Sequence, residues 1–184
     1  MGDKAERTRE KIKKAAYFLF AEKGFKEVTM TDLCEKTGLS RGGLYRHYSG
    51  TGEIFSEILS EESVIFDRIE EKESAEAILE DLLGAIQREI MERERSLSLA
   101  IYEYASLGNE ELLIRINERA KRRWIKLIEY GMKTSEFKRV DSEQVSELIL
   151  YYYQGLRMWS RVVPFHLQTA EHYTDTVRQL LLNR

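Results

Sequence analysis

Gly38 separates two short segments that both carry the signals of a helix, and this arrangement limits the fold more than any other feature of the chain. Before it, Thr29 stands three residues ahead of Asp32 in the spacing of a capping box, which predicts a helix to about Lys36. After it, Ser40 is a suitable N-cap for a further short helix. Two short helices joined by a glycine turn predict a helix-turn-helix.

A longer amphipathic helix is expected before this pair. Apolar residues recur every three or four positions between residues 5 and 23, with lysines around the other side. Gly24 follows as a C-terminal cap. The three helices together form an N-terminal domain that we place at residues 1–50.

Gly42 and Gly43 stand side by side in the third predicted helix, within residues 40–48. Each glycine costs about 1 kcal/mol relative to alanine in a helix interior, so packing alone does not account for the pair. A bare helix surface would allow the backbone to approach the major groove of DNA closely. Arg41 and Arg46 are then candidates for reading guanine O6 and N7 or for gripping phosphates, with Arg41 in the first turn better placed for base edges.

Positive charge is concentrated in the N-terminal part of the chain. The net charge of the whole chain is −3, which by itself argues against a nucleic-acid binder. Residues 1–50, however, contain 11 Lys and Arg against 7 Asp and Glu, whereas the remaining 134 residues contain 18 against 25. Because DNA binding needs positive charge only where phosphates lie, these values of +4 and −7 indicate a basic head on an acidic body.

Further residues of the N-terminal part follow a recognisable order and spacing. They are Gly24, Phe25, Thr29, Leu33, Thr37, Gly38, Leu39, Ser40, Gly42, Leu44, Tyr45, His47, Tyr48, Ile54 and Phe55. This pattern, within residues 8–56, resembles the DNA-binding domain of TetR/AcrR-type transcriptional regulators. The resemblance implies a homodimeric, ligand-responsive repressor whose third helix enters the major groove. Thr51 and Gly52 depart from the pattern, since the family often has lysine and then glutamate there, and we expect weaker phosphate anchoring at this point.

The resemblance also assigns contacts to individual side chains of the head. It implies that Tyr45, His47 and Tyr48 donate to phosphates, and we expect Thr29 and Thr31 to contact the DNA backbone. For the two tyrosines, burial with an exposed hydroxyl is the alternative. The complete predicted DNA-binding set is Thr29, Thr31, Ser40, Arg41, Gly42, Gly43, Tyr45, Arg46, His47, Tyr48 and Thr51.

The rest of the chain predicts helices only. Pro164 is the single proline, so almost nothing in the chain forbids helix. Apolar periodicity predicts helices over about 53–71, 75–93, 96–107, 109–132, 142–163 and 169–183, with a loop over 131–140. The 96–107 segment is apolar nearly all round, which predicts central burial. The predicted fold class is therefore all-α with about nine helices, the three-helix domain being followed by a larger dimerisation and ligand-binding domain at residues 51–184.

The last two predicted helices have more apolar surface than one core requires. Apolar residues lie on two sides of the 142–163 helix, which indicates packing against its own body and against a partner. By resemblance, this pair would form a four-helix bundle with the same pair of a second subunit. The alternative is a purely intrachain core. The predicted dimer interface consists of Val145, Ile149, Tyr152, Gly155, Leu156, Trp159, Val177, Leu180 and Leu181.

Aromatic residues of the body mark the expected position of an effector pocket. Aromatic rings with a buried acid would suit an unknown small-molecule effector that is flat and apolar or cationic. An ordinary core position is the alternative for each residue. The predicted pocket residues are Tyr102, Glu103, Trp124, Tyr130, Tyr152, Met158 and Trp159.

Catalytic and metal-binding patterns are missing from the sequence. His47, His166 and His172 lie far apart, and no HExxH or P-loop spacing occurs, so we expect no catalytic residue, metal or cofactor. Cys34 is alone, which excludes an intramolecular disulfide. The sequence contains no run of about 18 apolar residues and begins with charged residues, so we expect a cytoplasmic protein without a membrane partner.

The sequence therefore predicts a DNA-binding transcriptional regulator, a repressor that binds a palindromic operator as a homodimer and is released by a small-molecule effector. Two alternatives remain open. One is the same DNA-binding function controlled by a protein partner or without a small-molecule effector. The other is a helical enzyme or carrier whose basic head is incidental.

Overall fold

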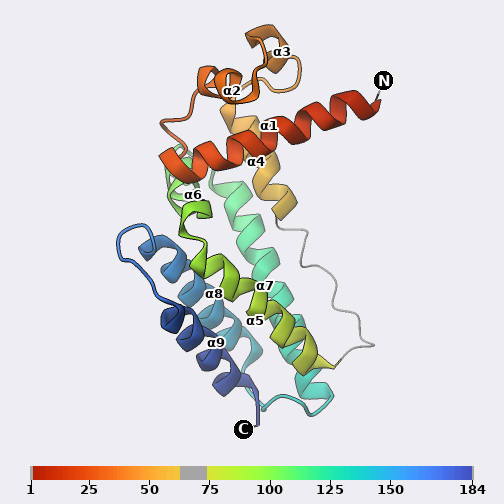
Figure 1. Ribbon diagram of the computed structural model, residues 1–184. Helices are drawn as coiled ribbons and strands as arrows, with labels where there is room; N and C mark the ends of the chain where they lie inside the picture. The colour runs from red at the N-terminus through yellow and green to blue at the C-terminus, as the bar shows by residue number, and fades with distance from the viewer. Residues whose placement is uncertain (1, 63–73, 184) are drawn as a thin grey trace. The chain divides into compact units, whose positions relative to one another are not determined.

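The structure is a computed structural model that describes residues 2–62 and 74–183. These residues contain nine α-helices, one 3₁₀ turn and no strand, which confirms the predicted all-α class (Figure 1). Contacts divide them into two compact units, a first unit of residues 2–62 and 97–114 and a second unit of residues 74–96 and 115–183. The predicted domain boundary at residue 50 concerns function and stays a prediction.

The first unit holds the N-terminal helices and one helix from the middle of the chain. Its helices are α1 (Gly2–Lys23), α2 (Met30–Thr37), α3 (Arg41–Tyr45), α4 (Thr51–Glu62) and α6 (Ser98–Ala105). Helix α1 packs against α2, α4 and α6. Phe20, Phe25, Phe55 and Tyr104 form an aromatic cluster with ring centroids 4.8 to 5.6 Å apart, and this cluster joins α6 to the N-terminal helices.

The second unit is built from the remaining helices. They are α5 (Ala75–Met91), the 3₁₀ turn η1 (Arg93–Arg95), most of α7 (Glu110–Lys133), α8 (Ser142–Trp159) and α9 (Leu167–Leu181). Helices α5, α8 and α9 contact one another. Their inward faces form one hydrophobic core with α7 and the residues that follow α7 and α9. The fully enclosed members of that core include Leu79, Leu83, Ile128, Tyr173 and Leu181.

Several predicted boundaries differ from the structure. Helix α4 begins at Thr51, two residues earlier than predicted, and the part of the predicted 53–71 helix beyond Glu62 lies outside the described residues. Helix α7 continues to Lys133, so the predicted loop starts later than Gly131. Helix α8 ends at Trp159, four residues before the predicted end.

The predicted central burial of the 96–107 helix was wrong. Within its unit, α6 is a short helix that buries Ala100 and Tyr104, whereas the side chain of Tyr102 is 66% exposed. Glu103 lies on the covered side, where its carboxylate accepts a hydrogen bond from the Lys26 N–H at 3.0 Å. The helix therefore buries one face, although its composition is apolar on nearly all sides.

The length and apolar character of a helix decide whether it can cross a membrane. None of the described helices combines the length and the apolar character that crossing a membrane requires.

Candidate DNA-binding site

The two helices of the helix-turn-helix have well-defined ends. Thr29 and Asp32 form the predicted capping box at the start of α2, and Lys23 also binds the Asp32 carboxylate at 2.8 Å. The hydrogen bonds from Lys23 and Thr29 hold the pKa of Asp32 well below its usual range. Gly38 ends α2 with a φ of 71°, a left-handed conformation that glycine adopts at no steric cost.

Helix α3 is shorter than predicted and is capped by a side chain. Ser40 accepts a hydrogen bond from the Gly43 N–H at 3.1 Å, and α3 ends at Tyr45. The following turn continues to Tyr48, whose N–H donates to the Leu44 carbonyl at 3.2 Å. Leu44 is fully buried and attaches α3 to the core of its unit.

The two adjacent glycines of α3 have different surroundings. A Cβ atom at Gly42 would meet no atom within 4 Å, so this position is open. A Cβ atom at Gly43 would lie 3.2 Å from the Ser40 hydroxyl oxygen, and Gly43 is buried. Gly42 thus leaves space on the surface for another molecule, whereas Gly43 makes room for the N-cap of its own helix.

Most of the predicted DNA-binding side chains are exposed. Arg41 donates to the Thr31 hydroxyl at 3.0 Å and so joins the exposed starts of α2 and α3. Tyr45 is 54% exposed. His47 and Thr51 are half-buried. The predicted residues that are exposed are Thr29, Thr31, Ser40, Arg41, Gly42, Tyr45 and Arg46.

Tyr48 differs from the prediction. Its side chain is 1% exposed, and its ring centroid lies 4.4 Å from the guanidinium carbon of Arg9. Burial and the nearby Glu57 carboxylate raise the pKa of its hydroxyl, which has no hydrogen-bond partner among the described residues. In this conformation the hydroxyl cannot reach a phosphate, so Tyr48 serves as a core residue of the first unit.

The start of α4 carries an acidic side chain next to the predicted phosphate anchor. The Glu53 carboxylate accepts hydrogen bonds from the Ser49 N–H at 2.6 Å and from the Ser49 hydroxyl at 2.8 Å, which lowers its pKa. A negative charge here opposes a phosphate. This electrostatic feature agrees with the weak anchoring expected from Thr51.

The predicted dimer residues fall into two groups in the second unit. Ile149, Val177 and Leu181 are buried in the core of the unit. Tyr152 and Trp159 are exposed, and Val145, Gly155, Leu156 and Leu180 are half-buried. All the predicted interface residues of α8 except Ile149 are therefore exposed or half-buried.

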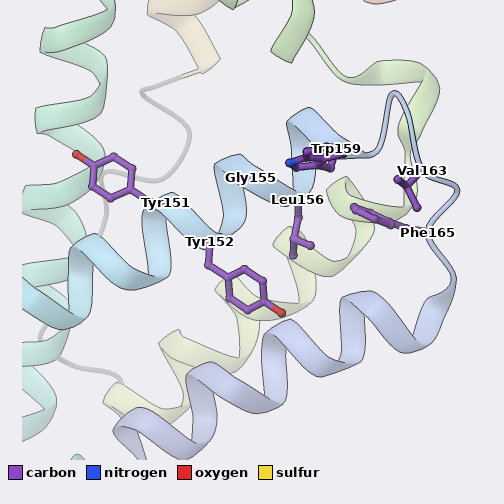
Figure 2. Close-up of a pocket in the computed structure, with 7 residues that line it drawn as sticks. All are labelled: Tyr151, Tyr152, Gly155, Leu156, Trp159, Val163 and Phe165. Atoms are coloured by element: carbon purple, nitrogen blue, oxygen red, sulfur yellow. The ribbon is translucent and has the colours of Figure 1, made fainter.

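An apolar groove lies along this side of α8. Its volume is about 410 Å³, and it is lined by Tyr151, Tyr152, Gly155, Leu156, Trp159, Val163 and Phe165. Figure 2 shows Tyr152 pointing from α8 toward α9, while Val163 and Phe165 come from the segment that follows α8. No charged side chain lines this groove.

The predicted effector residues are not brought together within one unit. Tyr102 and Glu103 belong to the first unit, and the other five belong to the second. Trp124 is buried in the core of the second unit and Tyr130 packs against that core. Tyr152 and Trp159 line the groove on α8, whereas Met158 is exposed and is not among the groove's lining residues.

Sequence reasoning missed one acidic residue of the second unit. Glu89 of α5 is half-buried, and its carboxylate accepts a hydrogen bond from the Tyr153 hydroxyl. The Tyr153 ring lies 6.4 Å from that of Tyr173, which in turn lies 5.1 Å from that of Tyr152. The aromatic run at residues 151–153 was visible in the sequence, but no local signal connects it with an acid about 64 positions earlier.

The fold and the exposed start of α3 define a helix-turn-helix DNA-binding protein. Residues 12–58 match the family described as bacterial regulatory proteins, tetR family. The chain is 30% identical over 138 residues to the HTH-type transcriptional regulator YfiR of Bacillus subtilis, a match that covers 70% of this chain and 67% of that protein. The chain therefore belongs to the TetR family of transcriptional regulators, as the sequence predicted.

Two further comparisons describe its relatives. The HTH-type transcriptional repressor KstR2 of Mycolicibacterium smegmatis is 22% identical over 138 residues, which are 71% of this chain and 67% of that protein. A transcriptional regulator from Saccharomonospora viridis, solved in complex with choline, has a similar fold with a TM-score of 0.80. That match covers 97% of this chain and 100% of the other at 17% identity.

Proposed function

We propose that the protein is a repressor that binds a palindromic operator as a homodimer and leaves it when a small-molecule effector binds. The observation that carries this proposal is the exposed surface of α3 and its C-cap, where Arg41, Tyr45 and Arg46 are exposed and Gly42 is open. Such a surface fits a major groove, because the glycine admits the DNA closely while the arginines supply donors for guanine and phosphate. KstR2, a relative, is a repressor by name, which supports the direction of control.

Each half of the operator would be read by one copy of α3. Arg41 would contact a base edge, since it lies in the first turn of the helix, and Arg46 would contact a phosphate. Thr29, Thr31, Ser40, Tyr45 and His47 would contact the DNA backbone around them. Half-sites of the operator would lie about 34 Å apart, one turn of the duplex.

A second copy of the chain would pack against the exposed side of α8. The groove there is apolar and lacks a charged group, which suits a helix of the partner better than it suits a cation. Gly155 adds room, because a Cβ atom at this position would meet nothing within 4 Å. In this proposal residues 1–50 are the DNA-binding domain, and residues 51–184 provide dimerisation and effector binding.

The effector would be an apolar or cationic small molecule bound within the second unit. Glu89 offers a carboxylate among Tyr152, Tyr153 and Tyr173, a combination that favours organic cations. The choline complex of the Saccharomonospora viridis regulator gives a precedent on the same fold. A thermal-shift screen with choline and larger quaternary ammonium ions tests this part. If none of these compounds shifts the melting temperature, control by a protein partner or by concentration alone is favoured.

The DNA-binding part of the proposal is tested with Arg41→Ala. An operator is first selected from random duplexes with the wild-type protein, and affinities are then measured for the operator and for a random duplex of the same length. We expect the variant to lose about 1 to 3 kcal/mol on the operator and to tolerate changes at one base pair. Equal weakening on both duplexes would show that Arg41 contacts only phosphate. If the wild-type protein binds no duplex at low salt, the proposed function is wrong.

A further inference from the structure

A cluster of ion pairs connects α1 with α4 inside the first unit. Lys13 is buried and lies 2.6 Å from the Glu10 carboxylate and 3.4 Å from that of Glu57, and it also pairs with Glu61. Burial lowers the pKa of Lys13, but the hydrogen bonds to Glu10 and Glu61 outweigh burial and the net pKa is raised. Lys13 is therefore charged at neutral pH, and its ion pairs with Glu57 and Glu61 hold the two helices together.

Arg9 extends this cluster to His47, in the turn that follows α3. One end of its guanidinium donates to the Glu57 carboxylate on α4. The other end, Nη1, donates to the backbone carbonyl of His47 at 3.0 Å. The guanidinium carbon lies over the ring of Tyr48, 4.4 Å from its centroid. One side chain of α1 thus contacts both α4 and the turn that follows α3.

Arginine is suited to this position by its shape. Its planar guanidinium offers donors in several fixed directions and also stacks on aromatic rings. A lysine in its place would keep the positive charge but would have a single nitrogen. That nitrogen could not bind the Glu57 carboxylate and the His47 carbonyl in the same geometry while also lying over the Tyr48 ring.

The C-terminal end of α3, the predicted recognition helix, needs contacts with other elements of its unit. Helix α3 has only five residues, and so short a helix is not stable without tertiary contacts. Ser40 fixes its start and Leu44 fixes its buried side. Its C-terminal end is fixed by the contacts of His47 and Tyr48 with Arg9.

We propose that Arg9 is a positioning residue for operator recognition, which sets the orientation of α3 by tying the His47 carbonyl to Glu57 of α4. This inference rests on the proposed reading of DNA by α3. A misplaced α3 loses its base contacts, whereas attraction between a basic head and phosphates depends little on orientation. Loss of the Arg9 contacts therefore weakens binding to the operator and leaves binding to random DNA nearly unchanged.

The test uses Arg9→Lys, which preserves charge, in the full-length protein. Affinities for the selected operator and for a random duplex of equal length are measured at the same salt concentration. We expect the operator affinity to fall about tenfold or more, as for a lost base contact, and the affinity for random DNA to stay within about twofold. Arg7→Lys is the matched control, because Arg7 is exposed on the same helix, and it should leave both affinities unchanged.

A second readout does not involve DNA. In the wild type, the N–H groups of His47 and Tyr48 donate to the Leu44 carbonyl at 2.9 and 3.2 Å. We expect both amides to exchange with solvent faster in Arg9→Lys. Glu57→Gln provides a second variant, which keeps an oxygen acceptor for Arg9 but removes its charge, and it should show the same pattern more weakly. If Arg9→Lys does not fold, the Glu57→Gln results decide.

Three outcomes overturn the inference. Wild-type affinities and exchange rates in Arg9→Lys would show that charge alone matters, as for a phosphate contact. Equal losses on both duplexes would show a general electrostatic role. Unchanged exchange at His47 and Tyr48 would show that Arg9 does not hold the turn. Failure of the wild-type protein to prefer any duplex would instead reject the proposed function, and the exchange rates would still test the role of Arg9.

Discussion

At the scale of single residues, Tyr45 and Tyr48 form a natural pair for testing which side chains meet DNA. Tyr48 is enclosed and its hydroxyl has no hydrogen-bond partner among the described residues, whereas Tyr45 is 54% exposed. We expect Tyr48→Phe to leave operator affinity unchanged and to be neutral or stabilising by up to about 1 to 3 kcal/mol, because a buried unpaired hydroxyl is costly. Urea unfolding and fluorescence anisotropy measure the two effects.

Tyr45→Phe is the matched comparison for Tyr48→Phe. It should leave the free energy of unfolding unchanged and weaken operator binding by about 1 kcal/mol, since the variant would lose the proposed hydrogen bond to phosphate. If Tyr48→Phe weakened the operator complex at unchanged stability, Tyr48 would have to turn outward on DNA. The sequence prediction would then be right and the core assignment wrong.

At Gly131, the ring of Phe137 leaves no room for a side chain. A Cβ atom there would lie 2.3 Å from the ring of Phe137, a buried residue whose N–H donates to the Gly131 carbonyl at 2.9 Å. We expect Gly131→Ala to destabilise the protein by about 1 to 3 kcal/mol through overpacking. Urea unfolding measures this loss.

Gly84→Ala serves as the control for Gly131→Ala. A Cβ atom at Gly84 would lie 3.7 Å from the Arg88 guanidinium, an ordinary contact inside helix α5. It should therefore stabilise the protein by up to about 1 kcal/mol, the usual gain of alanine over glycine in a helix. A neutral result for Gly131→Ala would mean that Phe137 moves aside freely.

Sequence reasoning succeeded for residues whose role is local. The capping box at Thr29, the turn at Gly38 and the N-cap at Ser40 are each set by neighbours within three residues, and all three are present as predicted. The pairing of Gly131 with Phe137 and that of Arg9 with His47 depend on tertiary contacts. Neither leaves a pattern in the local sequence.

At the scale of elements, the start of α5 depends on a carboxylate from another part of the chain. Glu136 accepts hydrogen bonds from the Ser74 hydroxyl and from the Glu76 N–H, the latter at 3.0 Å, and Ser74 caps the helix through the Ala77 N–H at 3.3 Å. These hydrogen bonds lower the pKa of Glu136 to about 2. The carboxylate thus satisfies two donors at the positive end of the helix.

The lowered pKa predicts how stability changes with pH. A carboxylate with a lowered pKa in the folded state stabilises that state above its ordinary pKa of about 4.3, and the contribution disappears as pH falls toward about 2. We expect Glu136→Gln to cost about 0.5 to 2 kcal/mol at pH 7, the usual value of a helix cap. The difference from the wild type should shrink through this pH range in urea unfolding.

Asp81→Asn is the control for the pH experiment, because Asp81 is an exposed carboxylate on the same helix. It should leave the pH profile of stability unchanged. A constant difference between wild type and Glu136→Gln down to pH 3 would contradict the role of the ionised carboxylate at the cap.

The elements themselves differ in how well they could be predicted. Helices with one clear apolar side, such as α1 and α5, were found close to their true ends. Helix α6 was placed correctly, but its burial was not, because an apolar composition does not say which sides find a partner within one chain. The contacts of Glu89 were missed for a similar reason, since its tyrosine neighbours come from α8 and α9.

At the scale of the whole molecule, the low charge and the short helix of one proposed DNA-binding head favour binding by two copies. Residues 1–50 carry a net charge of only +4, α3 has five residues, and the Glu53 carboxylate at the start of α4 would repel a phosphate. Two linked heads gain affinity because the second binding event is intramolecular. The proposed packing through α8 would therefore be needed for tight operator binding.

Trp159→Glu tests this dependence directly. Trp159 is 59% exposed at the groove on α8, and a charge there would be left without a partner in an apolar interface. We expect the variant to sediment at the chain mass of 21.6 kDa, with the wild type at twice that mass. Its operator affinity should fall about 10²-fold or more, whereas binding to an isolated half-site should not change.

Ile114→Glu is the control, since Ile114 is equally exposed at 59% and lies in the first unit, and it should leave assembly intact. A dimeric Trp159→Glu with wild-type operator affinity would exclude this side of α8 as the interface.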